Sequence, residues 1–527
     1  MRSRDRTGSL PPLTALAATA VLAVTALPPL VGADAHADTD PRPGRPTRAP
    51  GLYTPPAGEE AYRHLLQLVQ RRAPRDAAGV LAMIRTPRAV WLGDQSPAEV
   101  ESQVRATTRA AARQGVLPVL ALYDIPGRDC GNYSAGGAPD SAAYRSWIDA
   151  VARGIGDRPV LVVLEPDALA LLPQDCPDTG SWYDSGPGRD PGAGRDPDAG
   201  SDTPDEDWFG LGHRRPGGRD WPHLGDSLNG LGRPGWRPFH RAARGGTPGR
   251  PDRRDAAPAD PFRAEPADWK TRERYAELNY AVDVLEPLPG TRVYLDAGHS
   301  AWHRVPQIVP RLLAGGVSRA SGFFVNVSGY QSDEANVWYG RLISSCLAHA
   351  ARGGDPAACP TQDWPRDRAQ AWLDAHLGTL DPARMKHFVT DTSRNGRGPW
   401  TPPPARHSDP QDWCNPPGRG LGARPTLHTP DPLQDAALWV KTPGESDGQC
   451  LRGAGGPEDP ERGTADPAPG RWFPAQALEL VRLARPDIVP EWVGVLGARG
   501  LFPATPVHPD HPAPMDPAEP VPPDPPG

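Results

Sequence analysis

The sequence has 527 residues and a net charge of −7 at pH 7, which is long enough for one large domain or for two to three average ones. This acidic balance predicts no strongly basic face and therefore excludes nucleic acid as an expected partner. The 57 glycines and 70 prolines make up about a quarter of the chain, so part of it is expected to lie outside any packed core.

The N-terminal segment has the features of a targeting signal. Three arginines within the first six residues precede an apolar stretch over 13–27, and Ala35 and Ala37 supply the small residues of a cleavage site. The pattern predicts a signal peptide over 1–37 and a secreted, extracellular protein that is free of the membrane after cleavage. An uncleaved anchor is the alternative, although the apolar stretch is short for a membrane span.

The first half of the folded part is predicted to alternate helices with apolar strands. Residues 38–58 are expected to form a flexible leader and 59–177 the first part of the fold. Ser96-Pro97-Ala98-Glu99 is a typical helix start, with an N-cap, a proline at N1 and a glutamate at N3. In chain order, the expected elements are a helix at 61–72, strands at 78–84 and 89–93, a helix at 96–114, a strand at 116–125, a helix at 140–154 and a strand at 159–172.

Apolar periodicity stops at Pro177. Residues 178–267 consist mostly of Gly, Pro, Arg and Asp and are predicted to form a disordered, low-complexity insertion. The fold is expected to resume over 268–488, and a Pro-rich tail follows at 489–527. The expected elements are helices at 269–285, 305–313, 333–351 and 474–484 and strands at 292–299, 321–328, 387–393 and 437–441.

Continuous apolar runs separated by helices are typical of parallel strands that are buried on both faces. Counting the run at 78–84 as the first strand, seven such runs are present. They predict an α/β fold, a distorted seven-stranded parallel β/α barrel of the TIM-like kind with the long insertion within it.

Polar side chains gather at the C-terminal ends of the predicted strands, where β/α folds bind ligands. Carboxylates there, with aromatic residues and no metal or phosphate motif, fit glycosidic chemistry, which needs one protonated carboxyl and one ionised carboxylate. These polar residues are Asp124, Arg128, Asp129, Glu165, Asp167, Asp296, His299, Asn326, Asp391, Arg394, Glu445 and Asp447.

Seven segments resemble, in order, the motifs of glycoside hydrolase family 6, and the resemblance is to bacterial endoglucanases of this cellulase family. It covers about 60–177 and 268–485 and implies an inverting hydrolase of β-1,4-glucan, with cellulose or a related β-glucan as substrate. The segments are YDIPGRDCGNYSAGG (123–137), VLEPDALALL (163–172), YLDAGHSAWH (294–303), FVNVSGY (324–330), DTSRNGRGP (391–399), DWCNPPGRGLG (412–422) and WVKTPGESDG (439–448).

The resemblance implies a role for each of five catalytic residues. Asp167 matches the general acid, and Asp129 matches the aspartate whose charge keeps that acid protonated. Tyr123 matches the tyrosine that crowds the sugar at the cleaved bond, and Ser134 the serine that helps to hold the attacking water. Asp447 matches the proposed base; alternatively, the proton passes through water toward Asp129.

Further positions match residues that bind the sugar chain. Aromatic faces suit the C–H faces of glucose, and polar side chains bind its hydroxyl groups. The implied binding residues are Trp91, His299, Trp302, Asn326, Trp413, Lys441 and Glu445.

The six cysteines of this exported chain favour disulfides over metal ligands, and no metal or cofactor is expected. Residue spacing alone leaves fifteen pairings open. The resemblance implies the bridges Cys130–Cys176 and Cys414–Cys450. A third bridge, between Cys346 and Cys359, is expected only because these two cysteines remain after the other four are paired.

Two departures from the family pattern bear on how the substrate is cut. The insertion is unusually long and could shade the cleft or hang free, and Val305 stands about where cellobiohydrolases carry a further tryptophan. Loss of that platform, with the compact loop at 131–144, favours an open cleft and an endo-acting enzyme. The protein is also expected to be a monomer. The alternatives are a cellobiohydrolase of the same family and a non-catalytic glucan-binding protein on the same fold.

Overall fold

A computed structural model describes residues 51–176 and 268–490. Its centre is a curled sheet of seven parallel strands that lie in sequence order, which confirms the predicted β/α barrel. The strands are β1 (Val90–Leu92), β2 (Val119–Leu122), β3 (Val160–Leu164), β4 (Thr291–Asp296), β5 (Gly322–Val325), β6 (His387–Asp391) and β7 (Gln434–Leu438).

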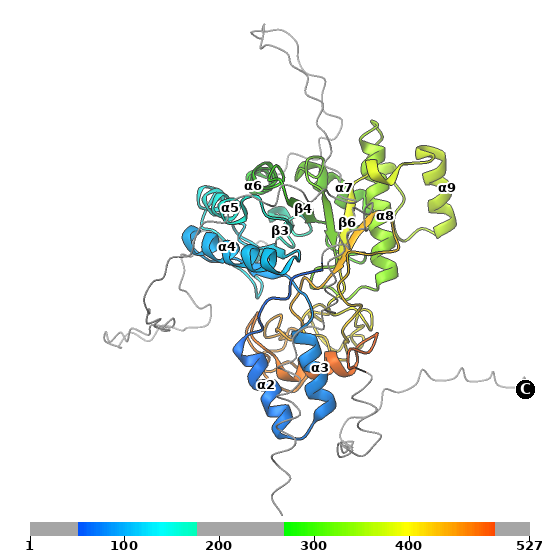
Figure 1. Cartoon of the computed structure of the whole chain (residues 1–527). Coiled ribbons are helices and arrows are strands. Elements are labelled where there is room, and N and C mark those ends of the chain that lie inside the picture. Colours follow the sequence, from blue (N-terminus) through cyan, green and yellow to red (C-terminus); the bar gives the residue numbers. More distant parts are fainter. Residues whose placement is uncertain (1–50, 177–267, 491–527) are drawn as a thin grey trace, which may run out of the picture. The chain divides into compact units, whose positions relative to one another are not determined.

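Helices between the strands cover the outside of the sheet (Figure 1). The polypeptide enters this arrangement through a helical pair, α2 and α3, which packs with α10 near the end of the described chain. The helices are α2 (Glu59–Gln70), α3 (Pro74–Ile84), α4 (Pro97–Gln114), α5 (Ser141–Ile155), α6 (Trp269–Leu285), α7 (Val305–Ala314), α8 (Asp333–Ala350), α9 (Arg366–Leu377) and α10 (Pro474–Arg482). Helix α9 has no counterpart among the predicted elements.

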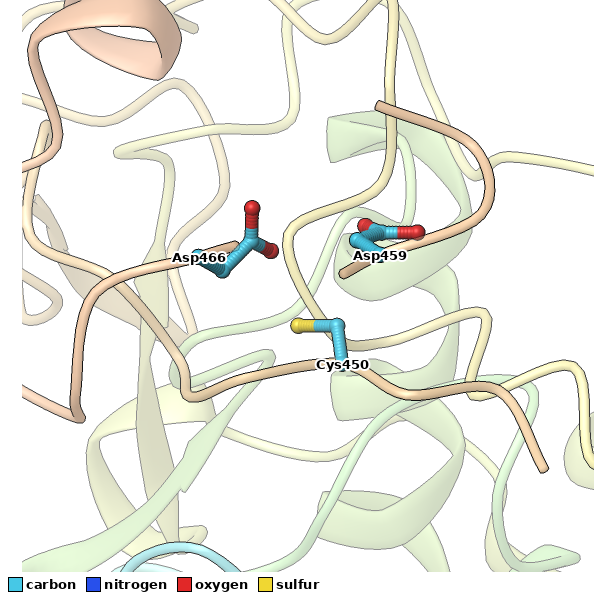
Figure 2. A group of neighbouring side chains, drawn as sticks. All are labelled: Cys450, Asp459 and Asp466. Carbon is cyan, nitrogen blue, oxygen red and sulfur yellow. The ribbon is translucent and has the colours of Figure 1, made fainter. Parts of the chain in front are cut away.

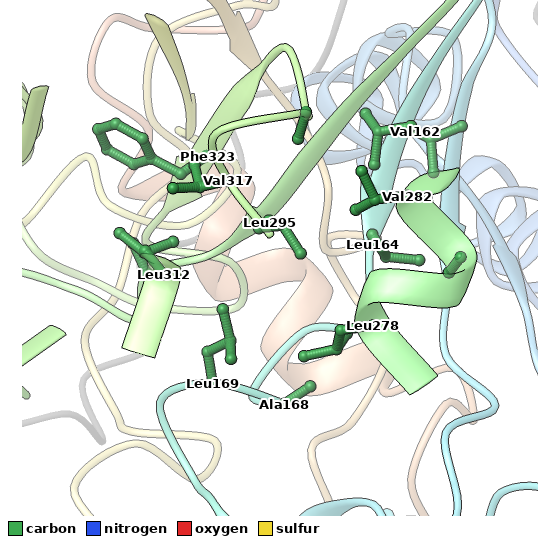
Figure 3. Packing of buried hydrophobic residues seen from close by; sticks show 14 of the residues in the cluster. Val162, Leu164, Ala168, Leu169, Leu278, Val282, Leu295, Leu312, Val317 and Phe323 are labelled. Atoms are coloured by element: carbon green, nitrogen blue, oxygen red, sulfur yellow. The ribbon is translucent and has the colours of Figure 1, made fainter. Parts of the chain in front are cut away.

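The apolar strand sequences are explained by burial on both faces. Val162 and Leu164 of β3 point toward α6 and pack with its Leu278 and Val282 (Figure 3). The alternate residues Leu161 and Val163 are also buried but lie outside that cluster, on the opposite face of the strand. Because both faces lose water, the strands carry continuous apolar runs instead of alternating ones.

The start of α4 follows the predicted capping pattern. The Ser96 hydroxyl accepts a hydrogen bond from the Glu99 N–H, and the Glu99 carboxylate accepts one from the Ser96 N–H at 2.8 Å. This reciprocal pair satisfies two main-chain groups that a helix start leaves open. The cap fixes where the chain turns from β1 into α4.

Two strand predictions need correction. Residues 78–84 belong to α3, not to a strand, and the first strand is the run at 90–92. Ala77, Val80 and Met83 are buried at helical spacing against α10, and short apolar runs do not distinguish a buried helix from a strand. The last strand also ends at Leu438, so most of the predicted run at 437–441 follows it.

The end of the predicted flexible leader, residues 51–58, differs from expectation because it packs onto the barrel. Tyr53 is buried, and its N–H donates to the Leu117 carbonyl at 2.9 Å. The Leu117 N–H in turn donates to the Gly51 carbonyl at 2.8 Å. These bonds tie the entry of the described chain to the residues that precede β2.

The sheet closes through single contacts at the seam between β1 and β7. Among the described residues no strand ladder joins these two edges. The Ala89 N–H donates to the Trp439 carbonyl at 2.9 Å, and the Trp91 indole N–H donates to the Val440 carbonyl at 2.8 Å. The barrel is therefore nearly closed, with Trp91 fixed at the seam.

Several predictions concern residues outside the described ranges: the signal peptide at 1–37, the leader up to residue 50, the insertion at 178–267 and most of the tail at 489–527. Within 51–176 and 268–490, no helix is both long and apolar enough to cross a bilayer.

Candidate active site

The sheet brings the predicted polar residues to one rim. All seven strands are parallel, so the segments after β2 to β7 leave the barrel at the same end. Several residues there hold a positive φ, among them Asp129 (61°), Asp167 (69°) and Asn326 (69°). Such conformations cost about 1–3 kcal/mol each and cluster at functional sites.

Asp167 lies among carboxylates that keep it protonated. Burial raises its pKa well above the ordinary value, and the charges of Asp296 and Asp129 raise it further. Asp296 accepts hydrogen bonds from the N–H groups of Leu169 and Ala170 at 3.2 and 2.8 Å, and these favour its ionised form. Burial raises the pKa of Asp296 only to about 6, so Asp167 holds the proton of this pair.

Asp129 is held in the loop after β2. Its carboxylate accepts a hydrogen bond from the Ser134 N–H at 2.9 Å, which places Ser134 beside it. Arg128 fixes the same loop, because its guanidinium donates to the Ser134 carbonyl and lies 4.6 Å from the centre of the Tyr123 ring. Burial raises the pKa of Asp129. The pKa of Tyr123 is raised by burial and then by Asp167 and Asp129, so these three residues lie within electrostatic range of one another.

Asp447 lies in a separate, cationic environment. The Arg394 guanidinium donates to one of its oxygens at 2.7 Å, and the Lys441 ammonium lies 3.0 Å from the other. Asn415 donates its N–H to Asp447 at 3.0 Å and accepts the Asp447 N–H at 2.8 Å. Burial alone raises the pKa of Asp447, but Arg394 and Lys441 together lower it well below 3.8. Asp447 is therefore firmly ionised.

Asp391 and Asn326 connect the loops that follow β5, β6 and β7. Asp391 accepts hydrogen bonds from the N–H groups of Ser328 (3.1 Å) and Lys441 (2.9 Å), so it joins the loops after β5 and β7. The Asn326 amide is fully buried; it donates to the Asp391 carbonyl and accepts the Gln331 N–H. Both of its polar ends are engaged, and its predicted contact with sugar stays a prediction.

The predicted aromatic platforms differ in exposure. The Trp302 and Trp413 side chains are 38% and 43% exposed, whereas Trp91 is half-buried at the seam and meets the Tyr123 ring edge-on at 5.5 Å. His299 lies 5.6 Å from Trp302, and burial lowers its pKa to about 4, so the imidazole is neutral at pH 7. Exposed indole faces and neutral donors suit uncharged sugar rings.

Disulfides join the loops that carry these residues. The structure contains the bridges Cys130–Cys176 and Cys414–Cys450, as the resemblance implied, and also Cys346–Cys359. The first bridge links the loop after β2, which carries Asp129, to the segment after β3. The Cys414–Cys450 bridge flanks Asn415 and Asp447, so both carboxylate environments are covalently braced.

Cys450, Asp459 and Asp466, which follow Asp447 in sequence, lie close together (Figure 2). Their grouping resembles a ligand set, but the Cys450 sulfur is bonded to Cys414 and supplies no thiolate. Both oxygens of Asp459 accept hydrogen bonds from Arg452, at 2.8 and 3.0 Å. Asp466 accepts the Asn415 amide at 2.8 Å. The chemistry of the group is therefore that of a brace for the Asp447 loop.

Glu165→Gln is expected to flatten the dependence of stability on pH. Glu165 is fully buried and accepts the N–H groups of Asp124 and Ile125, and burial raises its pKa to about 7 from 4.5. The native state thus binds more protons than the unfolded chain between these values, and stability falls as pH rises through them. A glutamine oxygen accepts the same bonds without charge, so the free energy of unfolding at pH 8 should rise by about 3 kcal/mol.

Urea unfolding at pH 4.5 and pH 8 measures this effect. Glu334→Gln serves as the control, since the Glu334 side chain is 79% exposed and its replacement should leave the dependence unchanged. If the free energy of unfolding changed equally between pH 4.5 and pH 8 in wild type and Glu165→Gln, a buried, protonated Glu165 would be contradicted.

Glycosidic hydrolysis needs one protonated carboxyl and one ionised carboxylate, and the mouth of this barrel holds Asp167 and Asp447 in these two states, which defines a site of the glycoside hydrolase class. The sequence profile of glycosyl hydrolases family 6 matches residues 47–186 and 263–484. The chain therefore belongs to glycosyl hydrolase family 6.

Individual relatives agree with this membership. The chain is 30% identical to endoglucanase A of Cellulomonas fimi over 441 residues, which cover 84% of this chain and 63% of that protein. It is 37% identical over 233 residues to the 1,4-β-D-glucan cellobiohydrolase C of Emericella nidulans, covering 40% and 44%. The endoglucanase Cel6 of Mycobacterium tuberculosis, solved with a thio-linked cellobioside, is 29% identical, has a TM-score of 0.50 and covers 82% of this chain and 97% of that one.

The structure gathers some residues for which the sequence assigned no role. Asp296, Asp391 and Arg394 were recognised only as polar residues at strand ends, and the bracing role of Asn415 was missed. Asn415 holds a positive φ of 36°, a conformation that asparagine tolerates better than most residues. The asparagine in the segment at 412–422 was the available signal, but its partner lies 32 residues away.

Proposed function

We propose that this protein is a secreted, inverting endo-β-1,4-glucanase in which Asp167 is the general acid. One observation carries the proposal: at one rim of the barrel, Asp167 is protonated whereas Asp447 is ionised. An inverting glycosidase needs one carboxyl that protonates the leaving oxygen while the attacking water loses its proton to an ionised group. The roles of Tyr123 and Ser134 follow the family resemblance, and Ser134 lies beside Asp129.

Asp167 supplies the proton in this scheme. Burial raises the pKa of its carboxyl, and the charges of Asp296 and Asp129 raise it further, so the group is neutral at the pH where Asp447 is ionised. As the glycosidic bond lengthens, negative charge gathers on the leaving oxygen and positive charge on the sugar ring. Transfer of the Asp167 proton neutralises the oxygen, and the ionised carboxylates stabilise the ring.

The proton of the attacking water has two candidate destinations. Asp447 is the predicted base, but its two oxygens are engaged by Arg394 and Lys441, and a carboxylate with a depressed pKa is a weak acceptor. Burial raises the pKa of Asp129, and Ser134 lies beside it. These contacts support the alternative in which the proton passes through water to Asp129 while Asp447 supplies negative charge and orients Lys441.

Endo action is supported by relatives and by sequence. Endoglucanases of Cellulomonas fimi and Streptomyces match 84% and 75% of this chain, whereas the matched cellobiohydrolase C covers 40%. Val305, at the start of α7, stands where a further platform is expected in cellobiohydrolases. Secretion and a monomeric state are part of the same proposal. A glucan-binding protein without turnover is the remaining alternative.

A proton-NMR time course on cellohexaose tests the proposal. The expected first product is the α-anomer at the new reducing end, released by cleavage at internal bonds, because inversion at a β-linkage yields α. Retention of the β-anomer would exclude the inverting mechanism. Release of cellobiose alone from one end would support a cellobiohydrolase, and binding without products would support the non-catalytic alternative.

A further inference from the structure

A cavity of about 740 Å³ lies at the seam of the barrel, outside the catalytic residues described above. It is lined by the segment at 55–63 that leads into α2, by residues between Met83 and Val90, and by parts of 442–445 and 470–472. Its volume is within the range of about 300–1,000 Å³ that is typical of pockets for small organic ligands. Of the residues that line it, only Glu445 has a role implied by the family resemblance, as a binder of sugar hydroxyl groups.

The cavity and the catalytic rim share one wall. The loop after β7 carries Lys441 and Asp447 toward the catalytic side, whereas Thr442, Pro443 and Glu445 line the cavity. Val90, on the other edge of the seam, lines the cavity directly before Trp91. Because Glu445 is a predicted sugar-binding residue and also lines the cavity, a glucan chain that it binds lies at the edge of this space.

Trp472 supplies a fixed aromatic wall. Its indole N–H donates to the His64 ring at 3.2 Å, and its main chain forms a bridge with Glu445. Gly444 has a φ of 91°, and a Cβ there would lie 2.7 Å from the Trp472 ring, so the glycine permits this close packing. The indole is half-buried and lines the cavity. A rigid aromatic face beside polar groups is suited to a sugar ring.

The charged groups of the cavity wall favour a neutral ligand. Arg63 pairs with Glu59 at 2.7 Å, and Arg471 pairs with Glu60. Arg88 donates to the main-chain carbonyls of Ile84 and Pro56 at 2.9 and 3.0 Å. An anion would have to compete with these partners, whereas hydroxyl groups can share them.

We infer that this cavity, called here the seam pocket, binds glucosyl units of the same β-1,4-glucan chain beyond those held by Trp91 and Glu445. The inference rests on the proposed function and extends it: the seam pocket selects for long chains. Trp472 stacks on a sugar ring, and the rim of Glu60, Arg63 and Arg471 meets its hydroxyl groups.

Gly58→Trp tests the inference by filling the seam pocket. Gly58 lines the pocket with an ordinary φ of −65°, and a Cβ there meets no atom within 4 Å, so the substitution needs no backbone strain. We expect kcat/KM on cellohexaose to fall about tenfold, as for loss of one aromatic stacking contact, while kcat/KM on cellotetraose is retained. Gly455→Trp is the matched control, because a Cβ at Gly455 also meets no atom within 4 Å but the residue lies outside the pocket.

Trp472→Leu is a second variant that removes the stacking face without filling the space. Both variants should lose the preference of the wild type for cellohexaose over cellotetraose, and thermal unfolding shows whether each is folded. If wild type cuts neither oligosaccharide, the proposed function fails. If wild type cuts both and the folded variants keep its preference, or lose activity on both substrates equally, the seam pocket is not a glucan site.

Discussion

Asp167→Asn is expected to lower kcat on cellohexaose by about 100- to 10,000-fold, the usual contribution of a general acid. Asparagine keeps the shape of the side chain but has no proton to give to the leaving oxygen. A cellobioside with a dinitrophenol leaving group needs no protonation, so its hydrolysis should be largely retained. Comparison of kcat on the two substrates measures the effect, and binding of cellohexaose should persist in isothermal titration.

Asp283→Asn is the matched control for this experiment. Asp283 makes an exposed pair with Arg319 at 2.7 Å, remote from the strand ends, so its replacement should leave both activities unchanged. Wild-type turnover of cellohexaose by Asp167→Asn, or an equal loss on both substrates, would contradict the assignment of the acid.

Arg394→Met is expected to have the largest effect on stability. Arg394 and Asp447 are both buried, and removing one partner of a buried pair typically costs about 3–5 kcal/mol because the other charge is left uncompensated. Lys441 remains near Asp447, so we expect a loss of about 3 kcal/mol at pH 7, measured by urea unfolding. Arg366→Met removes a pair with side chains 56% and 79% exposed and should cost less than about 1 kcal/mol.

The pH dependence gives this prediction a second check. Arg394 and Lys441 hold the pKa of Asp447 below its ordinary 3.8, so the stability they contribute is present above pH 3.8 and is lost as pH falls through the lowered value. The difference in the free energy of unfolding between wild type and Arg394→Met should therefore become smaller at acidic pH. A difference that stays constant from pH 7 to pH 3 would show that packing of the Arg394 side chain, and not its charge, carries the effect.

Regular elements with strong local signals were predictable from the sequence. Helix α6 and the cap of α4 have the predicted boundaries because capping side chains, Asp268 for α6 and Ser96 for α4, act within a few residues. The run at 78–84 was assigned wrongly, because its burial depends on α10, almost 400 residues away. Tertiary contact, and not local sequence, determined that segment.

The candidate site likewise has parts that the sequence predicts and parts that it does not. Asp167, Asp129 and Asp447 could be singled out as candidates because motif residues at strand ends share one rim. The ionisation of Asp447 was not predictable, because it depends on Arg394, which lies 53 residues away in sequence. Asn415 braces Asp447 from a conformation with positive φ that the sequence does not specify. Motifs therefore pointed to the candidate reacting groups, whereas the partners that set their charge required the structure.

The seam of the barrel has a consequence for biosynthesis. Trp91 is held by the Val440 carbonyl, 349 residues further along the chain, and Arg482 of α10 reaches back to Asp76 of α3. A ribosome releases the N-terminal end of a protein first, so α2, α3 and β1 emerge long before the partners that cover them. The nascent chain cannot complete its barrel until β7 and α10 have been translated, and its early apolar surfaces stay uncovered until then.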